Sequence, residues 1–198
     1  ELSVADFLEM VASDCPTPGG GSVAAVQGAL AASLVEMVSR LTLGKEKFKE
    51  HEALMTASLE EAYRLRIQFL DLTDLDTEAY DNVTAAYRMP KATDEERAER
   101  SSAIQHALKM ATNIPLETMQ RAQACLDIIG RIKGRINPNC DSDLNVAELS
   151  ARASLEGAWQ NVLTNLSGIK DAEFVEKTKN DCLMRGLAGR DSSVRRQY

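Results

Sequence analysis

The chain has 198 residues, a formal net charge of −7 and an aromatic content of 5 %. A chain of this length can form one domain around a hydrophobic core without cross-links or metals. The negative charge argues against general nucleic-acid binding, which needs many cationic contacts to phosphates. Residues that favour helices are common and residues that favour strands are scarce, so we expect an all-α protein.

Cysteine and histidine positions give no metal-site pattern. The four cysteines are scattered, at Cys15, Cys125, Cys140 and Cys182, and the two histidines are His51 and His106. Neither histidine follows a glutamate at the spacing of a bundle metal site, so we expect no metal. Scattered cysteines without a spacing pattern are typical of a reducing compartment, and residues 1–10 do not resemble a signal peptide. We therefore expect a cytoplasmic protein.

The first predicted elements are two helices joined by a glycine-rich turn. A short helix is expected over residues 4–13, opened by a pair with capping-box spacing, Ser3 and Asp6. Two prolines and three glycines then break the helix. An alanine-rich helix follows to about residue 43, capped at its start by Ser22 or a neighbouring glycine and at its end by Gly44. Its apolar run, 23–38, is too short and too alanine-rich for a membrane span, so we expect no membrane contact.

Four more helices are expected further along the chain. They cover about residues 47–88, 95–136, 142–166 and 173–187. Asp94 is the expected cap of the second of these, and Pro115 should kink it. Long helices with short connections predict a bundle of antiparallel helices. We expect one helical domain over residues 1–188 and a flexible basic tail over 189–198.

The glycine turn is the first candidate site. Three glycines at a helix start, Gly19, Gly20 and Gly21, allow backbone amides to converge on an anion. The turn lacks the Lys-Ser/Thr ending of a phosphate-binding loop. A tight turn with close helix packing is the alternative, and the motif alone favours it.

An acidic stretch, Asp71–Asp81, is the second candidate. Asp76 and Tyr80 share one helical face, while Asp74 and Glu78 lie on another. Crowded carboxyl groups raise one another's pKa, and burial adds to that effect. A carboxyl group with a raised pKa can act as a general acid or base. The alternative is a solvated acidic surface.

Two asparagines one helical turn apart, Asn161 and Asn165, form the third candidate, with Ser142 and Asp143 at the start of the same helix. The asparagines lie in an otherwise apolar segment, so each amide needs a fixed partner. The alternative is a helix cap and two amides that bond only to neighbouring backbone.

Together these stretches resemble the signatures of the formimidoyltetrahydrofolate cyclodeaminase and methenyltetrahydrofolate cyclohydrolase family, which includes the C-terminal domain of formiminotransferase-cyclodeaminases. The matching runs occur in the family's order over residues 3–175, and residues 130–136 depart from the family. The runs are Pro16-Thr17-Pro18-Gly19-Gly20-Gly21-Ser22-Val23-Ala24-Ala25, Leu43-Gly44-Lys45, Asp74-Leu75-Asp76-Thr77-Glu78-Ala79-Tyr80, Met89-Pro90-Lys91, Ser142-Asp143, Asn161-Val162 and Asn165-Leu166.

The resemblance implies an all-α homodimer with its site in a groove near the subunit contact. The implied substrate is a tetrahydrofolate derivative, which can carry a polyglutamate tail, and no other cofactor is implied. The expected reaction converts 5-formimidoyltetrahydrofolate to 5,10-methenyltetrahydrofolate and releases ammonia. The alternative is the reversible hydration of methenyltetrahydrofolate to 10-formyltetrahydrofolate. A non-catalytic folate-binding helical module is a further alternative.

The resemblance, together with charge spacing, assigns roles to residues. Asp76 is the expected catalytic group for proton transfer and charge stabilisation, with Asp74 in support. Lys45 is expected to pair with a tail carboxylate, and Asn161 and Asn165 to bond the pterin. The other expected substrate contacts are Pro18, Gly19, Gly20, Gly21, Ser22, Tyr80, Ser142 and Asp143.

Overall fold

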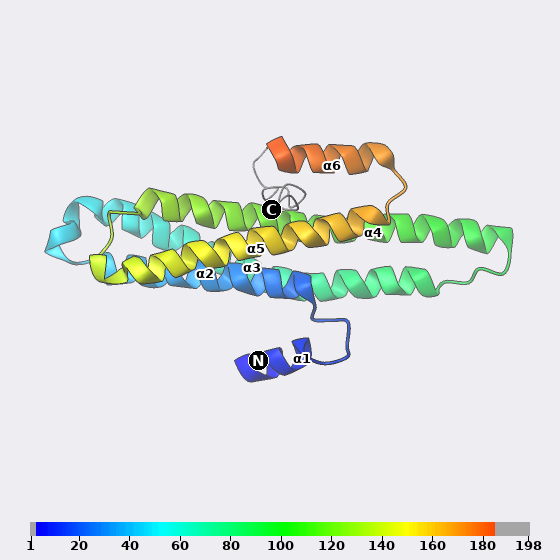
Figure 1. The fold of residues 1–198 in the computed structure, drawn as a ribbon, viewed down its shortest axis with the longest axis horizontal. Coiled ribbons are helices and arrows are strands. Elements are labelled where there is room, and N and C mark those ends of the chain that lie inside the picture. The colour runs from blue at the N-terminus through cyan, green and yellow to red at the C-terminus, as the bar shows by residue number, and fades with distance from the viewer. Residues whose placement is uncertain (1–2, 185–198) are drawn as a thin grey trace, which may run out of the picture.

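The computed structural model describes residues 3–184, and over that range it is all-α with no strand. Long antiparallel helices form the bundle, as the sequence predicted (Figure 1). The predicted tail, 189–198, and the predicted end of the last helix lie outside the described residues. The helices are α1 (Val4–Val11), α2 (Gly20–Thr42), α3 (Glu52–Arg88), α4 (Asp94–Ile132), α5 (Asp141–Ser167) and α6 (Ala172–Met184), with short 3-10 helices η1 (Glu46–His51) and η2 (Pro138–Cys140).

Helix α2 is the central element, because it packs against α3, α4 and α5. Its buried face consists mostly of alanine, glycine and valine, so neighbouring helices can approach its backbone closely. At Gly28, an added Cβ would lie 2.3 Å from the Phe69 ring of α3, which is itself fully buried. Although α2 is long and apolar enough to cross a membrane by composition alone, more than half of its residues are buried in the bundle.

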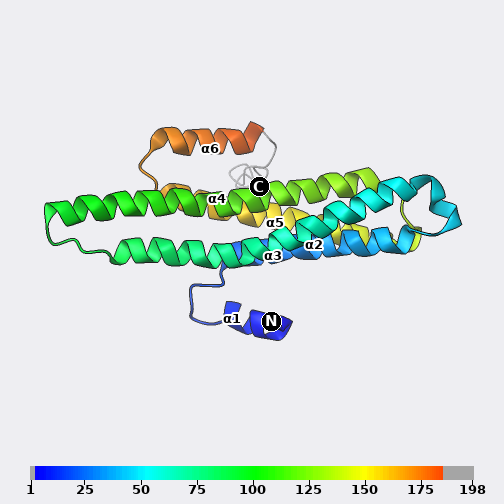
Figure 2. The ribbon, with the colours of Figure 1, turned by 180° about the vertical axis from the view of Figure 1, so that it is seen from behind.

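Helices α1 and α6 lie outside the bundle on opposite sides (Figures 1 and 2). The predicted capping box opens α1: the Ser3 hydroxyl accepts a bond from the Asp6 backbone N–H. No residue of α1 is buried. Near the start of α6, the Lys109 ammonium of α4 donates to the Asp171 carboxylate at 2.6 Å.

Two helix starts differ from the prediction. Thr93, and not Asp94, caps α4, since the Thr93 hydroxyl accepts from the Glu96 N–H and the Glu96 carboxylate accepts from the Thr93 N–H in return. This reciprocal pair of hydrogen bonds satisfies the backbone N–H groups of both Thr93 and Glu96, which explains why the cap lies at Thr93. The predicted α-helical start near residue 47 is instead η1, because Phe48 has a non-helical backbone (φ −118°, ψ 15°).

The end of α4 also differs. The helix stops at Ile132, four residues before the predicted end. Gly134 has a positive φ of 77°, a conformation that ends helices and suits glycine. Gly130 lies within the helix and does not interrupt it. Pro115 lies inside α4, as the sequence predicted.

Candidate active site

The glycine turn starts α2 and places a buried hydroxyl. Gly19 is the N-cap, so the glycine alternative for the cap is the correct one. Ser22 lies in the first turn of α2 and is fully buried. Its hydroxyl is 2.9 Å from the Asp76 carboxylate and 3.4 Å from the Thr73 carbonyl, both on α3. Ser22 therefore ties the start of α2 to the acidic stretch.

Gly21 allows the Asp76 carboxyl to lie directly against α2. A Cβ added at position 21 would sit 2.1 Å from Asp76 Oδ1 and 2.6 Å from its carboxyl carbon. Real Cβ atoms do not approach a neighbour that closely, so any side chain here would displace the carboxyl group. The glycine run thus serves close packing, which the sequence favoured, and that packing positions a reactive group.

Asp76 is the acidic residue of this stretch whose environment is altered. Its side chain is half-buried, whereas Asp71, Asp74 and Asp81 are exposed. Burial raises the pKa of Asp76 above its ordinary value, and the hydrogen bond from Ser22 opposes part of that rise. Of the two causes that the sequence suggested for a raised pKa, burial is the one that acts on Asp76, and crowding by other carboxylates is not.

Asn161 and Asn165 face this carboxyl group from α5. Both are half-buried, and the Nδ2 amide group of each donates a hydrogen bond to a backbone carbonyl. Asn161 donates to Gly157 in its own helix at 3.0 Å, and Asn165 donates to Ala111 of α4 at 3.1 Å. A carbonyl can only accept, so these contacts fix which amide atom is nitrogen. Each Oδ1 is left available as an acceptor.

These groups line one cavity of about 250 Å³. It lies where the glycine turn, α3, α4 and α5 meet. Of the predicted site residues it includes Gly19, Gly20, Gly21, Asp76, Tyr80, Asn161 and Asn165. The lining is completed by residues that were not predicted as site residues, namely Pro16, Thr17, Ala79, Val83, Ala111 and Thr164. Thr164 could have been found from its position three residues after Asn161, on the same helical face.

A second, more open cavity of about 650 Å³ adjoins the first. Both are lined by Pro16, Thr17 and Tyr80. Arg88, near the end of α3, also borders the second cavity. A ligand longer than the first cavity can therefore continue into the second, past the Tyr80 side chain, without leaving the protein surface.

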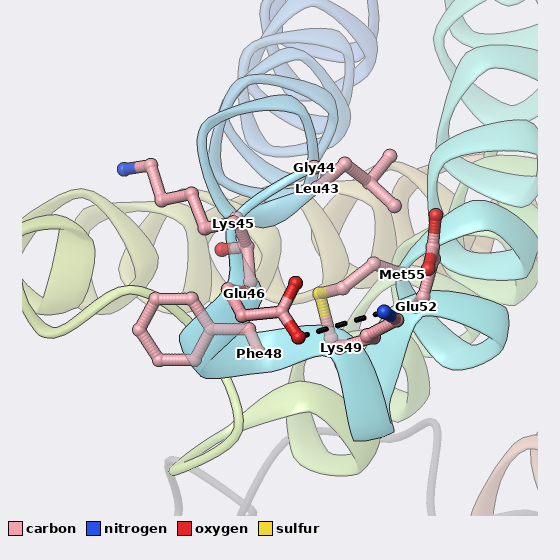
Figure 3. Close-up of a pocket in the computed structure, with 9 residues that line it drawn as sticks. Leu43, Gly44, Lys45, Glu46, Phe48, Lys49, Glu52 and Met55 are labelled. Atoms are coloured by element: carbon pink, nitrogen blue, oxygen red, sulfur yellow. Dashed lines mark hydrogen bonds and ion pairs between the residues drawn. The ribbon is translucent and has the colours of Figure 1, made fainter.

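Lys45 lies at the opposite end of α2 from the glycine turn. The helix between them has 23 residues, which corresponds to about 34 Å. Lys45 borders a separate cavity of about 210 Å³ together with Glu46 and Lys49. In Figure 3 its side chain extends away from the Glu46–Lys49 ion pair. Within one chain, Lys45 and Asp76 cannot contact the same small part of a ligand.

Ser142 and Asp143 lie at this same far end. They follow η2, which is held to the end of α2 by the Asn137 backbone N–H donating to the Thr42 hydroxyl at 3.0 Å. Neither residue lines the cavity that contains Asp76. The structure thus divides the predicted site residues between two ends of the bundle. In residues 3–184, no group of three or more metal-ligating side chains comes together.

The fold and this cavity define a helical-bundle protein with a half-buried carboxyl group facing two anchored amides. A sequence model of the formiminotransferase-cyclodeaminase family matches residues 3–183, and the chain belongs to this family. The resemblance noted in the sequence is therefore confirmed.

Individual relatives carry two activity names. The chain is 43 % identical over 175 residues to the methenyltetrahydrofolate cyclohydrolase of Methylorubrum extorquens, covering 88 % of this chain and 84 % of that protein. It is 33 % identical over 180 residues to the formimidoyltransferase-cyclodeaminase of Rattus norvegicus, covering 91 % of this chain but only 33 % of that protein. The crystal structure of the formiminotetrahydrofolate cyclodeaminase of Thermotoga maritima superposes with a TM-score of 0.81 at 30 % identity, covering 94 % of this chain and 92 % of that chain.

Proposed function

We propose that this protein is an enzyme acting on the one-carbon unit held between N5 and N10 of a tetrahydrofolate. The observation that carries the proposal is Asp76: a carboxyl group with a raised pKa, held by Ser22 and placed in a cavity. A carboxyl group so placed, with its pKa raised by burial, is suited to take a proton and return it during a reaction.

The cavity suits a reduced pterin. The pterin ring carries several N–H donors, and the wall formed by α5 offers two amide oxygens, those of Asn161 and Asn165, as acceptors. The adjoining cavity gives the rest of the folate a path past Tyr80. We propose that the glycine turn packs against the bound folate, with no cofactor beyond it.

In the hydrolytic direction, water attacks the methenyl carbon, and a C–O bond forms. The Asp76 carboxylate takes one proton from that water, which leaves a neutral hydroxyl adduct. The bond from carbon to N5 then breaks, N5 receives the proton from Asp76, and the hydroxyl proton passes to solvent. One cation and one water thus become neutral 10-formyltetrahydrofolate and one proton. The carboxylate also stabilises the cationic ring system that it faces.

The deaminating reaction uses the same centre. N10 attacks the protonated formimidoyl carbon, a C–N bond forms, and Asp76 takes the N10 proton. The carboxyl group then returns that proton to the amino nitrogen, which leaves as ammonia when its bond to carbon breaks. The cationic methenyl ring is the product. Both reactions therefore require one proton-transferring group beside the same carbon.

Cyclohydrolase activity is the first candidate, because the relative that bears this name is 43 % identical over most of its length. Cyclodeaminase activity, the reaction expected from the sequence, is the second. It is favoured by the match along 92 % of the Thermotoga maritima chain, which is named for that activity. A non-catalytic folate-binding module is the third, and it would leave the raised pKa of Asp76 without a role.

Absorbance of methenyltetrahydrofolate separates the three candidates. Purified protein is given methenyltetrahydrofolate in one assay and 5-formimidoyltetrahydrofolate in another. Loss of the signal above the uncatalysed rate in the first assay is the result expected of a cyclohydrolase. Appearance of the signal in the second identifies a cyclodeaminase. Silence in both, from folded protein that binds folate, would refute the catalytic proposal.

We further propose that the protein is a cytoplasmic homodimer. The outward side of α2 carries Leu30, Met37 and Leu41, which are 55 %, 36 % and 45 % exposed. Their spacing of seven and four residues puts them on one face of the helix, hereafter the α2 stripe. A two-fold axis across the stripe would pair two α2 helices antiparallel, so that Lys45 of one chain approaches the Asp76 end of the other. The cysteines are scattered and form no disulfide within residues 3–184, which supports a reducing compartment.

Light scattering on size-exclusion chromatography tests the dimer. We expect a mass twice that of the chain, and a single-chain mass for Leu30→Glu with unchanged helical circular dichroism. The matched control is Leu149→Glu on α5, which is 67 % exposed and lies outside the stripe. A monomeric wild-type protein would refute the dimer without touching the catalytic proposal.

A further inference from the structure

Pro115 is buried in the middle of α4, and the helix continues through it. A proline has no backbone N–H, so the carbonyl four residues earlier loses its helical partner. The proline ring also pushes that carbonyl away from the helix axis. In α4 this carbonyl belongs to Ala111, whose residue is only 6 % exposed. A buried carbonyl needs another donor.

Asn165 supplies that donor. Its Nδ2 lies 3.1 Å from the Ala111 oxygen, and the bond joins α5 to α4 across 54 residues of sequence. Both residues line the cavity that contains Asp76. Asn161, one turn earlier, is anchored differently, because its Nδ2 donates to Gly157 in its own helix. The absence of an N–H at position 115 therefore affects Asn165 and leaves Asn161 untouched.

We propose that Pro115 is a positioning residue of the folate site. Because Pro115 has no backbone N–H, the Ala111 carbonyl accepts its hydrogen bond from Asn165 instead. This bond fixes the orientation of the Asn165 amide and leaves its Oδ1 free to accept a hydrogen bond from the ligand. The ligand part of this inference rests on the function proposed above. A proline inside a helix lowers the stability of the fold. Pro115 therefore favours ligand binding at the expense of stability.

A stability cycle tests the contact without any ligand. We expect Pro115→Ala to raise Tm by about 5 °C, because it restores a helical hydrogen bond. Asn165→Ala should lower Tm clearly when Pro115 is present, since it leaves the Ala111 carbonyl without a donor. It should lower Tm much less in the Pro115→Ala background. Equal losses in the two backgrounds would overturn the proposal.

Asn161→Ala is the matched control for that cycle. Its carbonyl partner, Gly157, lies in α5 and is independent of Pro115. Its effect on Tm should therefore be the same in both backgrounds. A background-dependent effect at Asn161 would mean that Pro115 changes the bundle generally, and it would also overturn the specific link to Asn165.

Calorimetric binding of 5-formyltetrahydrofolate tests the functional part. We expect Pro115→Ala to weaken binding by about tenfold, although the variant is more stable, and the double variant to bind no worse than Asn165→Ala alone. A more stable variant with unchanged affinity would overturn the positioning role. If the wild-type protein bound no folate, the proposed function would fail, whereas the Tm cycle would still decide the Pro115–Asn165 link.

Discussion

The two ends of α2 differ both in the number of charged side chains and in how deeply those side chains are buried. At the Gly19 end, side chains from three helices close on a half-buried carboxyl group whose pKa is raised. At the Lys45 end, charged side chains are more numerous, but the Lys49–Glu46 pair is largely exposed and spans 3.5 Å. Exposed pairs of this kind contribute little energy. Burial of one carboxyl group, and not the number of charges, distinguishes the candidate active site.

The comparison between the two ends is tested most strongly at Asp76. We expect Asp76→Asn to lower kcat by about 10³-fold, because the amide cannot take a proton from water or N10. Asp71→Asn is the matched control: its side chain is exposed and the change should alter kcat less than about twofold. Steady-state assays with methenyltetrahydrofolate measure both. Similar losses in the two variants would show that the acidic stretch acts through its total charge.

Gly21→Ala should produce the next largest effect. The new methyl group would need the space of Asp76 Oδ1, so the carboxyl group must move. We expect kcat to fall by about 10²-fold, since displacements of about 1 Å are costly in active sites. Gly130→Ala on α4 meets no atom within 4 Å and should leave kcat unchanged. A fully active Gly21→Ala protein would mean that the position of Asp76 against α2 is unimportant.

Lys45→Ala tests whether the two ends meet through a second chain. In the antiparallel dimer we expect KM to rise about fivefold with kcat unchanged, as the loss of one charged contact to the folate tail predicts. In a Leu30→Glu monomer, Lys45→Ala should have no further effect. If KM is unaffected in the dimer, the Lys45 end plays no part in folate binding.

The smallest expected effect concerns pH and stability. Because the folded-state pKa of Asp76 is raised, its contribution to stability is fully present below the ordinary value of 3.8 and is lost as pH rises through the raised value. Asp76→Asn should therefore have a Tm about 1–3 °C above wild type at pH 7, with the difference vanishing near pH 4. The rate should fall as pH decreases through the same raised pKa. Calorimetry and initial rates at several pH values measure the two effects, and a less stable variant at pH 7 would contradict the buried charge.

Most of the fold followed from the sequence because helix-forming runs and breaking residues are local signals. Pro90 and the glycine turn mark their boundaries correctly. The end of α4 was harder, since Gly130 and Gly134 look alike in sequence and only the second adopts a positive φ. The non-helical backbone at Phe48 could not be predicted, because no proline or glycine lies within Glu46–His51.

The candidate site was predictable only in part, for a geometric reason. Family-like motifs identify residues but not the distance between them, and the length of α2 separates Lys45 from Asp76. The burial that raises the Asp76 pKa depends on Gly21 and Ser22 of another helix. The Asn165 bond to Ala111 crosses 54 residues, so no local pattern contains it.

Because α2 packs against helices that follow it in the chain, its faces become covered at different times during synthesis. Its partner α5 begins roughly 100 residues after α2 ends, an interval of about 5–20 s at ordinary rates of translation. Helix α3 follows almost at once and can cover the side that holds Gly21 and Gly28. The side of α2 that packs against α5 in the folded protein stays uncovered throughout that interval. During that interval the nascent chain therefore exposes an alanine-rich helix face that the finished protein buries.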